Sequence, residues 1–88
     1  MPNIKSAKKR MRTSERRHDA NRAARSRVLT ARRRLEKAAM AGDETASEEA
    51  LRTYASAVDK AAKRGAIAKN NASRRKARAR AMVQRALA

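Results

Sequence analysis

The chain has 88 residues, enough for one domain, at residues 1–88, with a thin interior. Its 25 Lys and Arg against 8 Asp and Glu give a formal net charge of +17, which indicates a polyanionic partner. It contains no Cys, which excludes disulfides and thiolate chemistry, and no apolar run long enough for a membrane span or a signal peptide, so we expect a cytoplasmic protein.

Three helices are predicted in chain order, at residues 5–41, 45–64 and 68–87. Gly42 and Gly65 follow the first two helical patterns, and glycine is favoured just past a helix end because it readily adopts a positive φ. The first predicted helix carries an apolar stripe only in its C-terminal half, at steps of three and four residues. That stripe consists of Ala20, Ala24, Val28, Ala31, Leu35 and Ala38.

The second predicted helix has a well-marked start. Asp43 and Thr45 are both suitable N-caps, and Thr45 with Glu48 fits a capping box. Apolar residues then recur on one face of this helix and of the third. The second stripe contains Leu51, Tyr54, Ala55, Val58, Ala61 and Ala62, and the third contains Ala72, Ala79, Val83, Ala86 and Leu87, with Ile67 before it.

Three apolar stripes on three helices predict an all-α fold, a three-helix bundle of antiparallel hairpins. The first helix would span roughly 55 Å and the second about 30 Å. The longer helix therefore has no partner over its N-terminal part, and we expect roughly the first 20 residues to project beyond the core.

Charge is distributed unevenly among these helices. Residues 1–41 carry a net charge of +11, residues 42–65 of −1 and residues 66–88 of +7. We therefore expect the first and third helices to flank the polyanion, while the second turns its acidic side to solvent.

Bases on the projecting part of the first helix are the main binding candidates. They recur at steps of three and four residues, which aligns them on one helix face suited to a phosphate backbone. A solvated basic tail is the alternative interpretation. The stripe consists of Lys5, Lys8, Arg12 and Arg16, broadened by Lys9, Arg10 and Arg17.

Further bases extend this charge into the bundle, and 17 of the 25 bases are Arg, whose planar guanidinium grips phosphate oxygens in a bidentate way. We assign about half of the arginines between residues 22 and 34 to binding, among them Arg22 and Arg25. The segment 69–78 adds amides, which can read 2′-hydroxyls or base edges, although Asn71 suits an N-cap equally well. Its candidates are Lys69, Asn70, Asn71, Arg74, Arg75, Lys76 and Arg78.

Other kinds of chemistry find little support. Tyr54 is the only aromatic residue, so stacking on unpaired bases has no platform, and structured RNA read by its backbone shape fits better. His18 and its neighbour Asp19 do not face each other on a helix, so they are not expected to form a catalytic acid–base pair. Glu48 and Glu49 are interpreted as charges that suit a helix start, not as a carboxylate pair or a metal site. Since no phosphate loop, nucleophile elbow or metal-ligand spacing occurs, we expect no enzyme, no cofactor, no metal and no small-molecule substrate.

Two segments give the chain a resemblance to a known family. The start, Pro2-Asn3-Ile4-Lys5-Ser6-Ala7-Lys8-Lys9-Arg10, and the later Gly65-Ala66-Ile67-Ala68-Lys69-Asn70-Asn71-Ala72-Ser73-Arg74-Arg75-Lys76-Ala77 resemble signatures of bacterial small-subunit ribosomal protein twenty. The Ala-Gly-Asp turn at residues 41–43 and the total length also match, so the likeness covers essentially the whole chain. The middle of the first helix departs from the family pattern in being richer in Arg.

This resemblance implies a three-helix bundle bound directly to 16S ribosomal RNA in the cytoplasmic small (30S) subunit. The family assembles early and contacts mainly the 5′ domain, with the long penultimate RNA helix and other small-subunit components nearby. The resemblance implies no membrane and no homo-oligomer. The positions it marks as RNA-facing are Asn3, Lys5, Ser6, Lys8, Lys9 and Arg10, with Lys69, Asn70, Arg74 and Lys76.

The function predicted from the sequence is that of a structural RNA-binding protein which neutralises phosphates and holds RNA helices together during 30S assembly. The alternative is a DNA-compacting, histone-like nucleoid protein, which would use the same charge. That alternative has less support, because the sequence shows neither a dimerisation seam nor wedge residues that kink duplex DNA. A membrane-surface helix is weaker still, because the basic segment has no Trp, Phe or Leu face.

Overall fold

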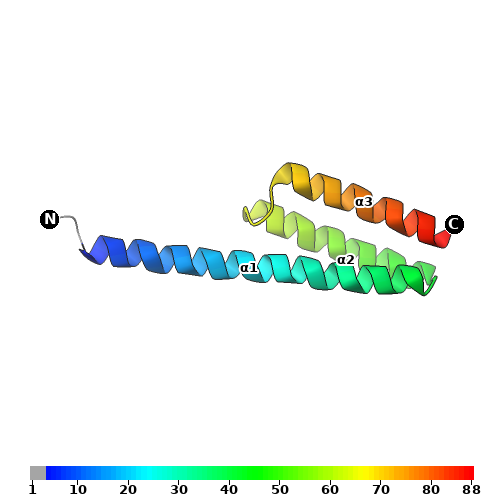
Figure 1. Ribbon diagram of the computed structural model, residues 1–88, viewed down its shortest axis with the longest axis horizontal. Helices are drawn as coiled ribbons and strands as arrows, with labels where there is room; N and C mark the ends of the chain where they lie inside the picture. Colours follow the sequence, from blue (N-terminus) through cyan, green and yellow to red (C-terminus); the bar gives the residue numbers. More distant parts are fainter. Residues whose placement is uncertain (1–3) are drawn as a thin grey trace.

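A computed structural model describes residues 4–88, which form three α-helices and no strand (Figure 1). α1 spans Ile4–Met40, α2 spans Glu44–Lys63 and α3 spans Lys69–Leu87. The predicted all-helical fold is thereby confirmed. The C-terminal half of α1 lies beside α2 and α3, and its N-terminal half extends past both, so the molecule measures 66 Å along its longest axis and 21 Å and 13 Å across it.

Both connections between helices are tight turns that depend on glycine. Gly42 has a φ of 72° and Gly65 a φ of 80°, values that side-chain-bearing residues adopt only with strain. After α2, the Ala66 N–H donates to the Ala61 carbonyl at 2.9 Å and the Gly65 N–H to the Ala62 carbonyl at 3.1 Å. This Schellman pattern satisfies carbonyls that the end of the helix would otherwise leave unpaired.

Replacing Gly65 with alanine is expected to lower the free energy of unfolding by about 1 kcal/mol, because alanine is strained at this positive φ. Apart from Gly65 itself and its two chain neighbours, no residue has an atom within 4 Å of the position that the new Cβ would take, so crowding adds nothing. Gly65→Asn is the control, since asparagine tolerates the left-handed region better and should cost less. Urea titration followed by circular dichroism measures both, and equal stability of wild type and Gly65→Ala would contradict the prediction.

The start of α2 corrects one sequence interpretation. Asp43 is the N-cap: its backbone is extended, with φ −86° and ψ 105°, and its Oδ1 accepts a hydrogen bond from the Ala46 N–H at 3.0 Å. Thr45 already lies inside the helix, so the expected capping box of Thr45 and Glu48 does not form. The difference arises because the chain turns helical directly after Gly42 and Asp43, which leaves Thr45 without the extended backbone that a cap requires.

The core lies between the C-terminal half of α1 and the two following helices. Its larger side chains are Val28, Leu35, Tyr54, Val58 and Val83, with Ile67 from the turn before α3, and alanines fill the space between them. Leu35 and Val58 are completely buried. Because most of the buried residues are small, the stability of the bundle depends on few large side chains.

In the last turns of α1 and α3 the buried face differs from the predicted one. Ala39 is buried and Ala38 only half-buried, while at the end of α3 Leu87 is half-buried and Ala86 is exposed. In each case the step that follows the preceding core residue, Leu35 or Val83, is four residues. The prediction of Ala38 was therefore one position short of the buried Ala39, and Ala86 was wrongly included beside Leu87, which does pack against the core, because a helix of 3.6 residues per turn alternates steps of three and four.

Ser47 is the one buried polar residue of the described part of the chain. It lies in α2, close to the turn that joins this helix to α1, and its Oγ has no hydrogen-bond partner. Ser47 lies four residues before Leu51 and so on the face of the apolar stripe, but its burial was not predicted because serine is mostly found at the surface.

Candidate nucleic-acid interface

The N-terminal part of α1, from Ile4 to Asp19, is a single exposed helix, which we name the arm. Every side chain in this range is exposed, whereas the first half-buried residue of α1 is Ala20 and the first buried one is Ala24. Its bases therefore contact no other helix. The arm presents its charge on all sides to an external partner.

One side of the arm carries the predicted stripe. The four stripe bases line one shallow depression together with Lys9 and Thr13, so the structure brings the candidates together as their spacing indicated. An adjoining depression lies on the neighbouring side of the arm, where hydroxyls accompany the bases. The first is lined by Lys5, Lys8, Lys9, Arg12, Thr13 and Arg16, and the second by Ser6, Lys9, Arg10, Thr13, Ser14 and Arg17.

Two candidates in the middle of α1 stand apart from these depressions. Arg22 and Arg25 are exposed and line neither of them. Asn3 lies outside the described residues. The role of all three in binding stays a prediction.

Some of the candidates on α3 line a groove between α1 and α3. Arg75 and Arg78 line this groove together with Arg32 of α1, above the buried side chains of Leu35 and Tyr54. Three guanidinium groups around one groove suit a phosphate group, which each can grip through paired N–H donors. Other candidates of this helix, Lys69, Asn70 and Arg74, are exposed outside the groove.

Asn71 also lines this groove, and its environment excludes one of the two roles that the sequence left open. α3 begins at Lys69 with Ala68 as its N-cap, and no side chain caps it, so Asn71 lies inside the first turn. Its Oδ1 accepts a hydrogen bond from the Arg75 Nε at 3.0 Å. The amide therefore orients an arginine of the groove, and the capping interpretation was wrong.

Lys76 differs from the other candidates because its charge is already paired. Its Nζ lies 2.8 Å from Asp59 Oδ1 of α2, and its side chain is 35% exposed. This ion pair joins α3 to α2. Such a partly exposed pair contributes little to stability, on the order of 1 kcal/mol or less, and it weakens the case for Lys76 as a direct phosphate contact.

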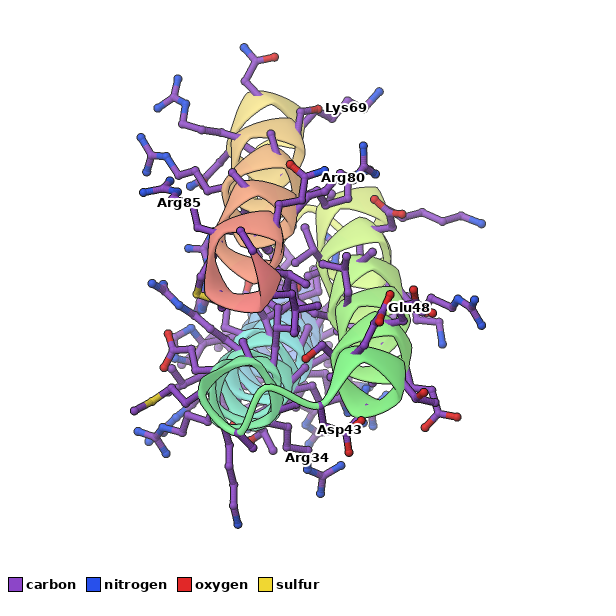
Figure 2. All side chains as sticks on the ribbon, turned by 90° about the vertical axis from the view of Figure 1, so that its right-hand side faces the viewer. Arg34, Asp43, Glu48, Lys69, Arg80 and Arg85 are labelled. Atoms are coloured by element: carbon purple, nitrogen blue, oxygen red, sulfur yellow. The ribbon has the colours of Figure 1, made fainter. Side chains whose placement is uncertain are left out.

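A third groove, which the sequence did not predict, lies between α1 and α2 on the side away from α3. Its bases are Arg27 and Arg34 of α1 and Arg52 and Lys60 of α2, and Figure 2 shows Arg34 pointing away from α3 there. Sequence reasoning missed it because the segment 42–65 has a net charge of −1, which hides two bases gathered on one side. Spacing gives a faint signal, since Arg52, Ser56 and Lys60 follow at steps of four residues.

The acidic residues compensate little of this charge. Residues 4–88 contain two ion pairs, Lys76 with Asp59 and Arg32 with Glu36. Glu48 is exposed, and Figure 2 shows it extending from α2 on another side than that of Arg34, in keeping with an acidic side turned to solvent. Arg32 is the one base of the named grooves that is paired with a carboxylate, and the other bases of the arm and of the grooves remain open to a polyanion.

Other functions gain no support from the described residues. Within residues 4–88, no group of three or more His, Cys, Asp or Glu side chains is placed to hold a metal ion. Among these residues, none of the helices has the length and hydropathy needed to cross a membrane. His18 is exposed on the arm.

A short helical bundle with an exposed cationic arm and arginine-lined grooves has the charge distribution that is typical of small polyanion-binding proteins. Comparison with known proteins narrows this class. The family model described as Ribosomal protein S20 matches residues 2–84, and the chain belongs to this family. The resemblance identified from the N-terminal and Gly65–Ala77 segments is confirmed.

Curated relatives agree with the family model. The chain is 46% identical over 76 residues to the small ribosomal subunit protein bS20 of Bifidobacterium animalis subsp. lactis, an alignment that covers 86% of this chain and 88% of the relative. It is 49% identical over 79 residues to the protein of the same name from Thermosipho africanus, covering 89% and 86% of the two chains. The bS20 protein of Roseiflexus sp. is 49% identical over 78 residues, covering 89% and 84%. Because this is a family of ribosomal structural proteins, the chain is not an enzyme.

Proposed function

We propose that this protein is a structural constituent of the small ribosomal subunit that binds directly to 16S ribosomal RNA. The observation that carries the proposal is the arm: a fully exposed basic helix attached to a bundle, in a chain of the ribosomal protein S20 family. It acts in the cytoplasm, as part of the ribosome. By neutralising phosphates where RNA helices approach one another, it holds those helices in place during 30S assembly.

The arrangement of the helices supports this role. We propose an antiparallel bundle, in which α2 returns along α1 and α3 returns along α2. The course of the chain in Figure 1 and the short turns at Gly42 and Gly65 support it. Such an arrangement presents the arm and the first turns of α3 to RNA.

The RNA partner proposed for this chain is the 5′ domain of 16S ribosomal RNA, with the penultimate RNA helix and other small-subunit components nearby. Phosphate contacts from the arm stripe and from the α1–α3 groove give the affinity. Asn70 and Ser6, both exposed, offer hydrogen bonds that read the 2′-hydroxyls of RNA. DNA lacks these hydroxyls, so the protein is expected to prefer RNA over DNA.

A competition experiment at physiological salt tests the proposal against the DNA-compacting alternative. Labelled 5′-domain RNA bound to the protein is displaced by unlabelled RNA or by duplex DNA of equal length. We expect the RNA to compete at least about tenfold better, because folded RNA offers both shape and 2′-hydroxyl contacts. Equal competition by duplex DNA would favour the DNA-compacting function, and failure to bind the RNA at all would refute the proposed one.

A further inference from the structure

We propose that the groove between α1 and α2 is a second RNA-binding surface, which receives the sugar-phosphate backbone of an RNA strand that also runs along the arm. This inference rests on the proposed function and assigns part of the binding to α2. Its basis is the arrangement of two bases from each helix, Arg27 and Arg34 with Arg52 and Lys60, around one groove. No carboxylate lines that groove.

The groove continues the arm along one side of α1. Lys8, Lys9, Arg12, Thr13 and Arg16 line the arm depression, and each has a counterpart 18 residues later that lines the groove. Eighteen residues make about five helical turns, or about 27 Å along the axis, so both sets face the same way. The counterparts are Ser26, Arg27, Thr30, Ala31 and Arg34. An RNA backbone lying on the arm stripe is therefore directed toward the groove.

The acidic residues on this side set the limits of the groove. Asp19 falls between the two sets of bases along α1, so contacts are expected at both ends of the path and fewer in its middle. On α2, Glu49 lies one turn before Thr53 on the same side of the helix. The cationic surface therefore ends before the turn at Gly42.

The hydroxyls in the groove favour RNA over other polyanions. The Thr30 Oγ1 donates its proton to the Ser26 carbonyl at 3.0 Å, and the Thr53 Oγ1 donates to the Glu49 carbonyl at 3.1 Å. Each threonine oxygen can then only accept a hydrogen bond from a ligand. A phosphodiester has no hydrogen to donate, whereas the ribose 2′-hydroxyl has one, so bases and threonines together match both parts of an RNA backbone.

The absence of Cys from the chain allows a direct test of proximity. Ser56 lines the groove and is exposed, and Glu48 extends from the same helix on another side (Figure 2). An iron chelate that generates hydroxyl radicals is attached to the single thiol of S56C or E48C, and each protein is bound to purified 16S ribosomal RNA. We expect local strand cleavage from position 56 and much weaker cleavage from position 48. Equal cleavage from both positions would overturn the inference. So would the absence of cleavage from position 56, which would favour solvent or an acidic protein segment as the occupant of the groove.

Affinity measurements separate this inference from the proposed function. The double variant R52Q/K60Q should bind 16S ribosomal RNA about 10- to 20-fold more weakly, with a salt slope lower by about 1.5, because two phosphate contacts are lost. The matched control R80Q/R85Q removes the same charge from exposed positions of α3 outside all the grooves and should have much less effect. If both double variants bind alike, the groove is not a contact surface. The triple alanine variant of Lys5, Lys8 and Arg12, measured in parallel, tests the proposed RNA binding by the arm independently of the groove.

Discussion

Changing Lys5, Lys8 and Arg12 together to alanine is expected to weaken binding to 16S ribosomal RNA about 100-fold at physiological salt while leaving the bundle folded. All three side chains line one depression on the exposed arm and touch no other helix. If some eight bases contact phosphates, the slope of log affinity against log salt should be about −6 to −7 for the wild type and shallower by about 2 to 3 for the variant.

Salt-dependent binding titrations and circular dichroism of the free protein measure these two effects. The matched control replaces Lys37, Arg80 and Arg85, three exposed bases outside the predicted contacts, with alanine. An equal loss of affinity in both triple variants would show that only net charge matters. A collapse of the helical signal in the arm variant would show that these lysines and Arg12 support the bundle, contrary to the structure.

Leu35→Ala is expected to destabilise the bundle by about 3 kcal/mol, and in a domain with so thin a core this leaves little folded protein. Leu35 is fully buried between α1 and its neighbours and is one of the few large side chains of the core. Its removal leaves a cavity that the surrounding alanines cannot fill, because they have no longer side chains to move into it.

Leu29→Ala is the control, since Leu29 lies on the same helix and is 48% exposed. Urea titration of both variants compares the same chemical change inside and outside the core. We expect the Leu29 variant to unfold close to the wild type, within about 0.5 kcal/mol. Similar midpoints for the two variants would mean that the core does not depend on Leu35.

Much of the fold could be predicted because its determinants are local. Helix ends at glycine, apolar steps of three and four, and the excess length of the first helix can each be read from neighbouring residues, and Gly42 and Gly65 do adopt positive φ. The choice between Asp43 and Thr45 as N-cap could not be predicted, since both side chains are competent and only the backbone at Asp43 is extended.

The candidate binding surface was predictable only where one helix forms it. The arm stripe needs no tertiary structure, so spacing alone placed its bases on one side. The groove between α1 and α2 forms only when the two helices pack together. This packing places Arg34 in the same groove as Arg52 and Lys60, which are distant from it in the sequence. The same holds for the pairing of Lys76 with Asp59, which are 17 positions apart.

The isolation of the arm has a consequence for the life of the protein before assembly. A helix without tertiary support is marginal in water, and one crowded with like charges is more so, so the arm of a free molecule unwinds readily. An unwound segment rich in Lys and Arg is a good substrate for proteases that cleave after basic residues. Bound RNA would shield these peptide bonds. Copies made in excess of the available ribosomal RNA should therefore be removed first, which matches the amount of protein to the number of subunits under construction.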